Sequence, residues 1–566
     1  MLQKETKHRI TFLLFLIFVG FSIIIFKLFK LQILDHDFLF KRAEQQQKRT
    51  LSLEGRRGNI YDQKGELLAT SITVQSLYAT PKIIKDKTSL SAKLSPILGI
   101  SATNIKKKLN NDLLFVWLKR KLNKQETKKI QQLQHPGLNF LPEEKRFYVY
   151  DNLASTLLGF TGIDNKGLSG IEFFFNSHLQ GKPGKFIMKS DPFGREIFFG
   201  KRQLQEPIVG KKLYLTIHNF LQYIAERELK KAIIQNSAKG GCIIILDPYS
   251  GDILAMASSP NYNPNYYFNY PIESRKNKTV EIVYEPGSTF KAITIASALN
   301  EKIITPKTKI SCPDKLKFGG VVINDSHHHK TEEKDIGEIL AESLNVGTAK
   351  IGLLLGKSKL YKYIKLFGFG QKTGIELSGE ASGIVRHPKN WTDSDSAIIP
   401  FGHGIAVTPI QLIMAIGAIA NGGILYKPNL VKYIESENGK FLQKYPKKQI
   451  RRVLRKKVSD KIKRMMIKVT TEGTGKFVKI YGYNVAGKTG TAQKVNPNGA
   501  GYLKNTYISS FVGFLPAQKP KAVILVVIDE PIYGKHYGSV CAAPAFKNIA
   551  EEAIRYLSIP PKPQAK

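Results

Sequence analysis

A serine and a lysine, Ser288 and Lys291, stand three residues apart directly after a Pro-Gly pair. They open an apolar run that continues to Leu299, and in a helix positions i and i+3 share a face. A lysine amine that is removed from water loses its proton easily and can accept the proton of a serine hydroxyl. The pair therefore predicts a nucleophile and its base for acyl transfer. Because Ser-x-x-Lys also occurs on ordinary solvated helices, this prediction depends on partners elsewhere in the chain.

A second polar string lies downstream, where Ser343 and Asn345 flank Leu344. This spacing suits a short turn from which a hydroxyl and an amide reach into one cleft. The amide can hold a lysine or a substrate carbonyl, and the hydroxyl can relay a proton. The string therefore predicts two further groups for the same site.

A third string, Lys488-Thr489-Gly490-Thr491, lies in a segment whose small and β-branched residues predict a strand. Lys488 supplies positive charge, and the two threonine hydroxyls can bind a carboxylate. Gly490 lets another backbone approach closely. Each string alone is usually an ordinary turn, but the three in this order match a signature of acyl-serine enzymes. Together they predict an active site.

The three strings resemble those of the penicillin-binding protein and serine β-lactamase superfamily. Other parts of the chain resemble the class B penicillin-binding proteins, the monofunctional D,D-transpeptidases of bacterial wall synthesis. These parts are residues 57–62, 65–69, 168–172, 181–184, 247–256, 367–375 and 401–409. The resemblance extends over nearly the whole chain.

The resemblance implies a role for each matching residue. Ser288 would attack the carbonyl between two terminal D-alanines of a peptidoglycan stem peptide, and Lys291 would accept its proton. Ser343 would relay the proton to the departing D-alanine. Asn345 would position Lys291 and the substrate amide. Lys488 would be a cation that lowers the pKa of its neighbour.

The same resemblance implies how the substrate is held. Backbone N–H groups of Ser288 and Thr491 would form the oxyanion hole, with Gly490 between the substrate-binding residues. Thr489 and Thr491 would bind the terminal carboxylate of the stem peptide. β-Lactam antibiotics would acylate the same serine. No metal or organic cofactor is implied.

The implied fold class is α+β, layered as α/β. It comprises a transpeptidase domain like that of penicillin-binding proteins and serine β-lactamases, an N-terminal elongated pedestal and a single transmembrane helix. The expected parts are a cytoplasmic tail (1–9), an anchor (10–34), a stalk (35–50), a dimerisation-type pedestal (51–205), the transpeptidase domain (210–560) and a tail (561–566). Strands at 523–528 and 508–514 should pair, with the Lys488 strand beside them and a helix from 543 to 556 on one face.

The N-terminal apolar segment predicts a membrane anchor. Residues 10–26 are almost wholly apolar, and the apolar character continues to residue 34. No small-residue cleavage site follows, so the segment is interpreted as uncleaved. Lys4, Lys7 and Arg9 favour a cytoplasmic N-terminus, although Lys27 and Lys30 weaken the asymmetry. The expected place is the cytoplasmic (inner) membrane, with the catalytic domain on the periplasmic side.

A formal net charge of +41 indicates anionic partners. Nucleic acid is the main alternative, but no RRM, zinc-finger or helix-turn-helix pattern accompanies the charge, and we predict no nucleic-acid binding. Solvated basic surfaces near anionic lipid explain the positive charge better than nucleic-acid binding does. Cys242, Cys312 and Cys541 make no disulfide framework. Cys242 and Cys541 are expected to be buried, and a disulfide at Cys312 stays open.

The run from His327 to His329 allows a metal site. Adjacent side chains point in different directions in any regular element, and no second ligand motif accompanies them. A solvated loop before Ser343 is the preferred interpretation.

Alternatives to cross-linking remain open at this point. A D,D-carboxypeptidase or a serine β-lactamase would use water as acceptor, and a non-catalytic scaffold or β-lactam sensor would keep the serine without turnover. The residues 284–287 and 343–345 favour the division-type branch, whereas Leu344 and Val149 depart from its pattern, so an elongation-type enzyme stays possible. The family implies a SEDS-type glycosyltransferase and other division proteins as membrane partners.

Overall fold

The computed structural model describes residues 2–111, 113–189, 202–496, 499 and 501–561. The chain divides into two compact units. The first contains Met1–Arg56, Thr73–Lys145 and Gly181–Val209, and the second contains Arg57–Ile72, Arg146–Gln180 and Gly210–Lys566. The expected pedestal (51–205) is therefore shared between the two units, and its boundaries stay a prediction.

The first unit begins with a long apolar helix. Helix α1 (Leu2–Phe29) continues through a π-helical turn (Lys30–Leu34) and is followed by α2 (His36–Gln47). The span Thr6–Leu34 contains an 18-residue stretch with a mean hydropathy of 2.7 and no buried residue. It is the one helix of the described chain that is long and apolar enough to cross a membrane, and it fits the predicted single anchor.

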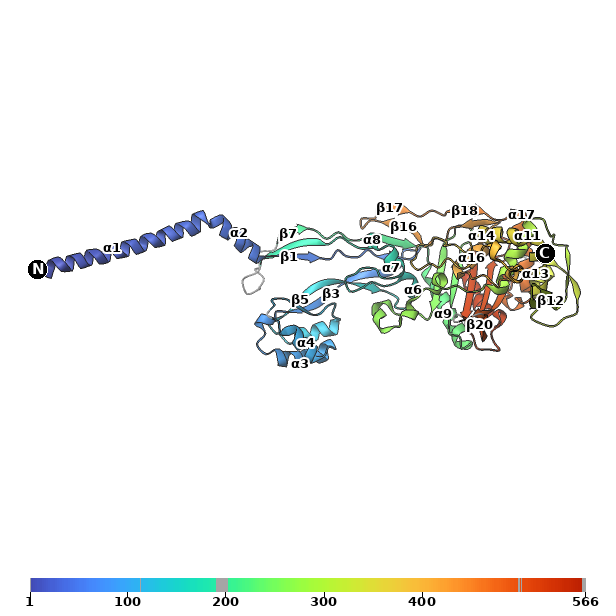
Figure 1. The fold of residues 1–566 in the computed structure, drawn as a ribbon, viewed down its shortest axis with the longest axis horizontal. Helices are drawn as coiled ribbons and strands as arrows, with labels where there is room; N and C mark the ends of the chain where they lie inside the picture. The colour runs from blue at the N-terminus through green and yellow to red at the C-terminus, as the bar shows by residue number, and fades with distance from the viewer. Residues whose placement is uncertain (1, 112, 190–201, 497–498, 500, 562–566) are drawn as a thin grey trace. The chain divides into compact units, whose positions relative to one another are not determined.

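The rest of the first unit combines short helices with strands. A small core joins helices α3 (Lys87–Leu98), α4 (Ala102–Leu109) and α5 (Lys124–Gln131) to β4 (Val116–Lys119) and to the strands β3 (Leu67–Ala79) and β5 (Leu138–Tyr148). Figure 1 shows α3 and α4 beside these strands. A separate sheet contains β1 (Lys48–Leu53), β6 (Gly184–Lys189) and β7 (Arg202–Gln205).

The second unit is built on a five-stranded antiparallel sheet of order β10-β9-β21-β20-β19. Its strands are β9 (Gly240–Leu246), β10 (Ile253–Ser259), β19 (Ala486–Val495), β20 (Tyr502–Leu515) and β21 (Ala522–Asp529). Gly513 of β20 faces Ile524 of β21, and Lys488 of β19 faces Val512 of β20. The predicted pairing of these strands, with the Lys488 strand at their side, is confirmed.

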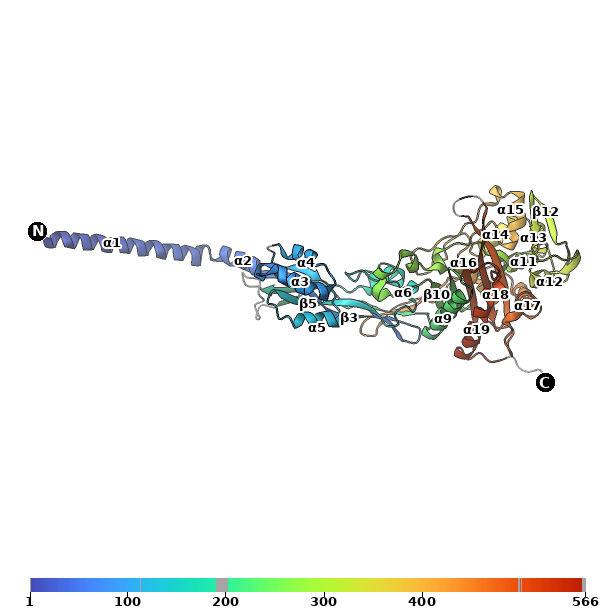
Figure 2. The same ribbon diagram turned by 90° about the horizontal axis from the view of Figure 1, so that it is seen from below.

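Helices cover both faces of this sheet. Helices α9 (Asn219–Gln235) and α19 (Ala543–Tyr556) share a core with one set of strand side chains, such as Ile243 and Ile524. The alternate residues, such as Ile244 and Leu525, pack into the core that contains α11 (Lys291–Asn300), α16 (Pro409–Ala420) and α17 (Lys456–Thr471). Figure 2 shows the sheet between these helices. The predicted layered α/β arrangement and the helix at 543–556 are confirmed.

Smaller elements complete the second unit. Strands β17 (Phe441–Lys444), β16 (Val431–Glu435), β8 (Lys212–Leu215) and β2 (Ile60–Tyr61) follow one another in one sheet. Further strands form two-stranded sheets: β11 (Lys309–Cys312) with β14 (Glu332–Asp335), β12 (Lys315–Phe318) with β13 (Val321–Asn324), and β15 (Ile424–Tyr426) with β18 (Gln449–Arg452). The remaining helices used below are α7 (Gly170–Phe174), α12 (Ile336–Glu342), α13 (Asn345–Leu355) and α18 (Gly538–Cys541).

A buried ionic cluster joins three distant segments of the second unit. Arg57 and Arg146 each donate from Nε to Glu172 at 2.6 Å, one to each carboxylate oxygen. The side chains of both arginines are 1% exposed, and that of Glu172 is fully buried. Arg57 also donates to the carbonyl of Glu172 at 2.7 Å, and Arg146 to the carbonyl of Gly58 at 2.8 Å. The cluster therefore fixes α7 against the segments that carry the two arginines.

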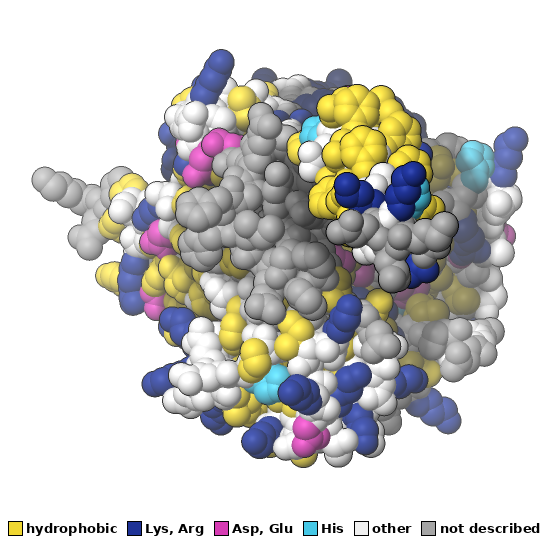
Figure 3. Space-filling model, turned by 90° about the vertical axis from the view of Figure 1, so that its left-hand side faces the viewer, with side chains coloured by type: hydrophobic (Ala, Val, Ile, Leu, Met, Phe, Trp, Pro, Cys, Tyr) yellow, Lys and Arg dark blue, Asp and Glu magenta, His cyan; other side chains and the backbone are white. Residues whose placement is uncertain are grey.

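The three cysteines, Cys242, Cys312 and Cys541, are buried free thiols. The predicted burial of Cys242 and Cys541 is confirmed, and Cys312 has no disulfide in this structure. Lys and Arg side chains dominate over Asp and Glu on the face drawn in Figure 3, as the net charge of +41 leads one to expect.

Candidate active site

Ser288 lies in a 3-10 turn (Gly287–Phe290) that leads directly into α11, whose first residue is Lys291. Gly287 has a φ of 53°, in the left-handed region that favours glycine, and its N–H donates to the carbonyl of Gly402 at 3.1 Å. Ser288 is partly exposed, whereas Lys291 is fully buried. The turn therefore presents a reachable hydroxyl at the head of a buried helix.

Ser343 and Asn345 occupy the predicted short turn, which here connects two helices. Ser343 follows the last residue of α12 and has a φ of 63°, and Asn345 is the first residue of α13. A left-handed conformation at a residue other than glycine costs about 1 kcal/mol or more and is concentrated at functional sites. The turn brings both side chains toward Lys291.

Lys291 is held by this turn through three contacts. Its Nζ donates to the carbonyl of Ser343 at 2.5 Å and to Oδ1 of Asn345 at 2.6 Å, and lies 3.2 Å from Oγ of Ser343. These contacts hold the amine at the first residue of α11, next to the turn that contains Ser288.

Lys488 approaches the same hydroxyl from β19. Its Nζ donates to Oγ of Ser343 at 2.9 Å and to the carbonyl of Thr489 at 3.1 Å. The Ser343 hydroxyl therefore lies between two amines, those of Lys291 and Lys488. The structure brings Lys291, Ser343, Asn345 and Lys488 together, and Ser288 lies in the turn that adjoins Lys291.

Both amines have lowered proton affinity. Burial lowers the pKa of Lys488 from 10.5 to about 7. Burial also lowers the pKa of Lys291 well below 10.5, the nearby charge of Lys488 lowers it further, and the carboxylate of Asp325 opposes both effects. Two ammonium groups around one hydroxyl repel each other, so a neutral amine is available near neutral pH. Such an amine can serve as a general base.

The predicted substrate-binding residues differ in their access to solvent. Thr491 is partly exposed, and its Oγ1 accepts from the N–H of Gly538 at 3.1 Å. Thr489 is only 7% exposed, and its hydroxyl contacts that of Thr474 at 2.9 Å. A Cβ at Gly490 would lie 2.8 Å from the methyl group of Thr289, so a larger residue would displace the Ser288 turn from β19.

Sequence reasoning missed Asp325. Its buried carboxylate accepts from the backbone N–H groups of Asn345 and Val346, the latter at 3.2 Å, and thus caps α13. Capping by a carboxylate also complements the positive end of the helix. The residue lies too far from α13 in the chain for a local capping pattern to reveal it.

A second group that sequence reasoning missed surrounds Glu285. One carboxylate oxygen accepts from the N–H of Gly404 at 2.8 Å, and the other lies 3.0 Å from both Tyr502 Oη and His403 Nδ1. These contacts fix the segment that precedes Ser288 to the 402–407 segment. The sequence indicated both segments separately, but gave no sign that Glu285 joins them.

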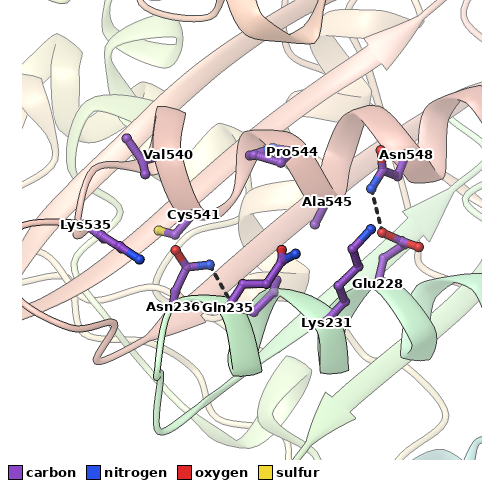
Figure 4. Close-up of a pocket in the computed structure, with 11 residues that line it drawn as sticks. Glu228, Lys231, Gln235, Asn236, Lys535, Val540, Cys541, Pro544, Ala545 and Asn548 are labelled. Carbon is purple, nitrogen blue, oxygen red and sulfur yellow. Dashed lines mark hydrogen bonds between the residues drawn. The ribbon is translucent and has the colours of Figure 1, made fainter.

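The structure also contains a pocket away from these residues. It has a volume of about 400 Å³ and lies between α9 and the helices α18 and α19 (Figure 4). Asn548 donates to Glu228 at 2.7 Å across it, and Lys231, Lys535 and Cys541 also line it. None of the predicted catalytic residues belongs to its lining, so a ligand there would not contact Ser288.

The histidine run divides in the structure. The side chain of His328 is 86% exposed and contacts Asp314, as expected of a solvated loop. The side chain of His329 is only 15% exposed and pairs with Asp325, so the solvated interpretation is wrong for this residue. Within the described ranges, no group of three or more His, Cys, Asp or Glu side chains could hold a metal ion.

Two family models match the chain. The penicillin binding protein transpeptidase domain matches residues 241–551, and the penicillin-binding protein dimerisation domain matches residues 52–215. The chain belongs to the class B penicillin-binding proteins. The family predicted from the sequence is confirmed, and with it the presence of a transpeptidase domain.

Relatives and solved structures agree with the family. Stage V sporulation protein D of Bacillus subtilis is 33% identical over 562 residues, which cover 98% of this chain and 87% of that protein. Peptidoglycan D,D-transpeptidase FtsI of Escherichia coli K12 is 32% identical over 539 residues, 94% of this chain and 89% of that protein. A peptidoglycan synthetase structure from Bifidobacterium adolescentis has a TM-score of 0.73 at 26% identity, covering 92% of this chain and 98% of that one.

Proposed function

We propose that this chain is a serine-type D-Ala-D-Ala transpeptidase that cross-links peptidoglycan stem peptides during septal wall synthesis and is a target of β-lactams. The observation that carries the proposal is the Ser343 hydroxyl between the amines of Lys291 and Lys488, beside the turn of Ser288. The related E. coli FtsI is named a peptidoglycan D,D-transpeptidase, and this relationship supports the same reaction for this chain.

In the acylation step, Oγ of Ser288 attacks the carbonyl carbon between the two terminal D-alanines, and the neutral amine of Lys291 takes the serine proton. Backbone N–H groups of Ser288 and Thr491 stabilise the oxyanion, and a donor of this kind contributes about 3 kcal/mol in other acyl-transfer enzymes. The C–N bond then breaks. The proton passes from Lys291 through the Ser343 hydroxyl to the departing amine, since that hydroxyl lies 3.2 Å from Lys291 Nζ.

In the second step, an amine of a neighbouring stem peptide attacks the ester of Ser288. An amide cross-link forms as the bond between the acyl carbon and Oγ of Ser288 breaks, and the proton of the amine returns through the same groups to Oγ. The partly exposed Thr491 binds the terminal carboxylate of the donor peptide, and the more deeply placed Thr489 supports Lys488 and the strand. Gly490 keeps β19 close to the Ser288 turn.

The proposal includes the cellular setting. Helix α1 anchors the chain in the cytoplasmic membrane, with residues 1–9 inside and the transpeptidase domain (210–560) on the periplasmic side. The pedestal (51–205) and the anchor meet a SEDS-type glycosyltransferase and other division proteins. The long apolar helix α1 supports the anchor, and the FtsI relatives support the division branch.

The nucleophile is tested by Ser288→Ala. The full chain in detergent is exposed to fluorescent penicillin, and the wild type is expected to carry a covalent label that the variant lacks, because no hydroxyl remains to be acylated. Ser297→Ala is the matched control. Ser297 lies in α11 and donates to the carbonyl of Ile293 at 2.7 Å, so its removal alters the same helix but leaves labelling intact. Equal labelling of Ser288→Ala and the wild type would refute the nucleophile.

The reaction and the branch are tested by supplying Ser288→Ala or the wild type to cells depleted of the protein. We expect filaments in depleted cells and in those with the variant, and normal division with the wild type. Analysis of the wall from the same cells measures cross-linked dimers. Rounded cells would overturn the division branch, and trimmed stem peptides without dimers would indicate water as the acceptor.

A further inference from the structure

The histidine run between β13 and β14 is the motif that the transpeptidase reaction leaves unexplained. Its members have different surroundings. His328 is exposed and contacts Asp314 at 2.8 Å, whereas His329 Nε2 lies 3.1 Å from Oδ2 of Asp325, whose side chain is 1% exposed. His329 therefore faces a buried carboxylate, and His328 faces solvent.

The hydrogen-bond partners of His329 favour its protonated form, the imidazolium. Nδ1 lies 2.8 Å from the carbonyl oxygen of Lys330, and Nε2 faces the carboxylate of Asp325. Both neighbours accept hydrogen bonds, and only the imidazolium form has N–H groups on both ring nitrogens. In agreement, the hydrogen bond to the Lys330 carbonyl, followed by the interaction with Asp325, raises the pKa of His329 above 6.5.

Asp325 connects this imidazolium to the active site. Its other oxygen, Oδ1, accepts from the N–H groups of Asn345 and Val346. Asn345 in turn accepts from Nζ of Lys291 at 2.6 Å. The carboxylate of Asp325 raises the pKa of Lys291, against the effects of burial and of Lys488. The charge on Asp325 therefore influences the pKa of Lys291, the proposed base.

We propose that His329 is a positioning residue of the acyl-transfer site, which as an imidazolium holds and neutralises the carboxylate of Asp325 and so controls the charge that Lys291 experiences. This inference rests on the proposed function. It assigns a role to one histidine of the run and none to His328. No proton passes from His329 to the substrate, because the residue acts through Asp325 and α13.

Other titratable groups lie near the pair. They are Asp314, Lys315, His327, Glu332 and Cys312. Asp314 contacts His328, and Glu332 contacts Lys334 at 2.7 Å. Burial raises the pKa of Cys312 to about 11, so this thiol is neutral at ordinary pH. His329 is therefore the cation that forms an ion pair with Asp325 in the described structure.

The test is His329→Gln in the full chain in detergent. Glutamine can still donate to Asp325, but it carries no charge. The second-order rate of acylation by fluorescent penicillin is measured against pH. Because the uncompensated carboxylate favours the charged form of Lys291, we expect the acid limb of the profile to move to higher pH by about one unit, or about tenfold in rate below the limb.

His328→Gln is the matched control. It removes from the same loop an imidazole that contacts Asp314 and not Asp325. The acid limb of its pH profile should coincide with that of the wild type. Asp325→Asn should move the limb to lower pH, and adding His329→Gln to it should cause no further shift. An unmoved limb in His329→Gln, or a uniform loss of rate at every pH, would overturn the inference. Absence of acylation in the wild type would instead overturn the proposed function.

Discussion

Replacing Lys291 by methionine lowers the rate of penicillin acylation of Ser288 by about 10²–10⁴-fold, the usual contribution of a general base. The amine is fully buried, and burial together with the nearby Lys488 holds its pKa well below 10.5, which favours the neutral form that can take the serine proton. Methionine has similar length and suits an apolar site, so the helix is expected to stay folded. Stopped-flow or gel measurement of fluorescent penicillin labelling determines the rate.

Lys350→Met provides the control for this result. Lys350 lies on α13, the helix that begins with Asn345, and its Nζ donates to the carbonyl of Ser311 at 2.6 Å. It has no contact with Ser343, so its loss tests whether removing a partly buried lysine from this region is itself harmful. We expect an acylation rate close to that of the wild type. A wild-type rate in Lys291→Met would show that another group, such as Lys488, is the base.

Replacing Glu172 by glutamine lowers the free energy of unfolding by about 3–5 kcal/mol, the usual cost of removing one partner from a buried ion pair. Glutamine keeps the shape of the side chain, but it leaves Arg57 and Arg146 as buried cations without a counter-charge. Both guanidinium groups lie 2.6 Å from the carboxylate in the wild type. Denaturant or thermal unfolding of the full chain in detergent measures the loss.

Glu273→Gln is the control for the cluster. Glu273 contacts Lys276 at 2.8 Å, but its side chain is 66% exposed, and exposed ion pairs contribute little to stability. Stability should therefore change little. If Glu172→Gln were no less stable than this control, the buried cluster would not stabilise the fold.

The pH dependence of the same variant has a definite sign. Burial alone would raise the pKa of Glu172, but Arg146 and Arg57 outweigh it and hold the pKa below 4.5. A lowered pKa in the folded state means that the carboxylate stabilises the fold above its unfolded pKa. This stabilisation is lost as the pH falls through the lower, folded value. The difference in stability between the wild type and Glu172→Gln should therefore begin to shrink as the pH falls below 4.5, and should keep shrinking until the folded carboxyl is protonated.

Residue types and local patterns are enough to predict the chemistry and the local elements of this protein. Ser288 and Lys291, the Ser343 turn and the Lys488 strand are each short strings whose residue types limit what they can do. The pairing of 508–514 with 523–528 was also predictable, since adjacent strands of alternating or continuous apolar character joined by a turn tend to pair. Helix α1 could also be predicted, because its apolar composition is a property of a single continuous segment.

The packing of distant segments determines which groups meet, and local patterns do not reveal it. Nothing local in the chain indicates that Ser343 Oγ lies between two amines, or that Asp325 caps the helix of Asn345. Three adjacent histidines have the same chemistry in the sequence, yet His329 faces a buried carboxylate and His328 faces water. Burial and nearby charge set the pKa of each group, and both depend on how segments far apart in the chain pack together. The residue types were therefore visible in the sequence, whereas their protonation and their partners followed from the fold.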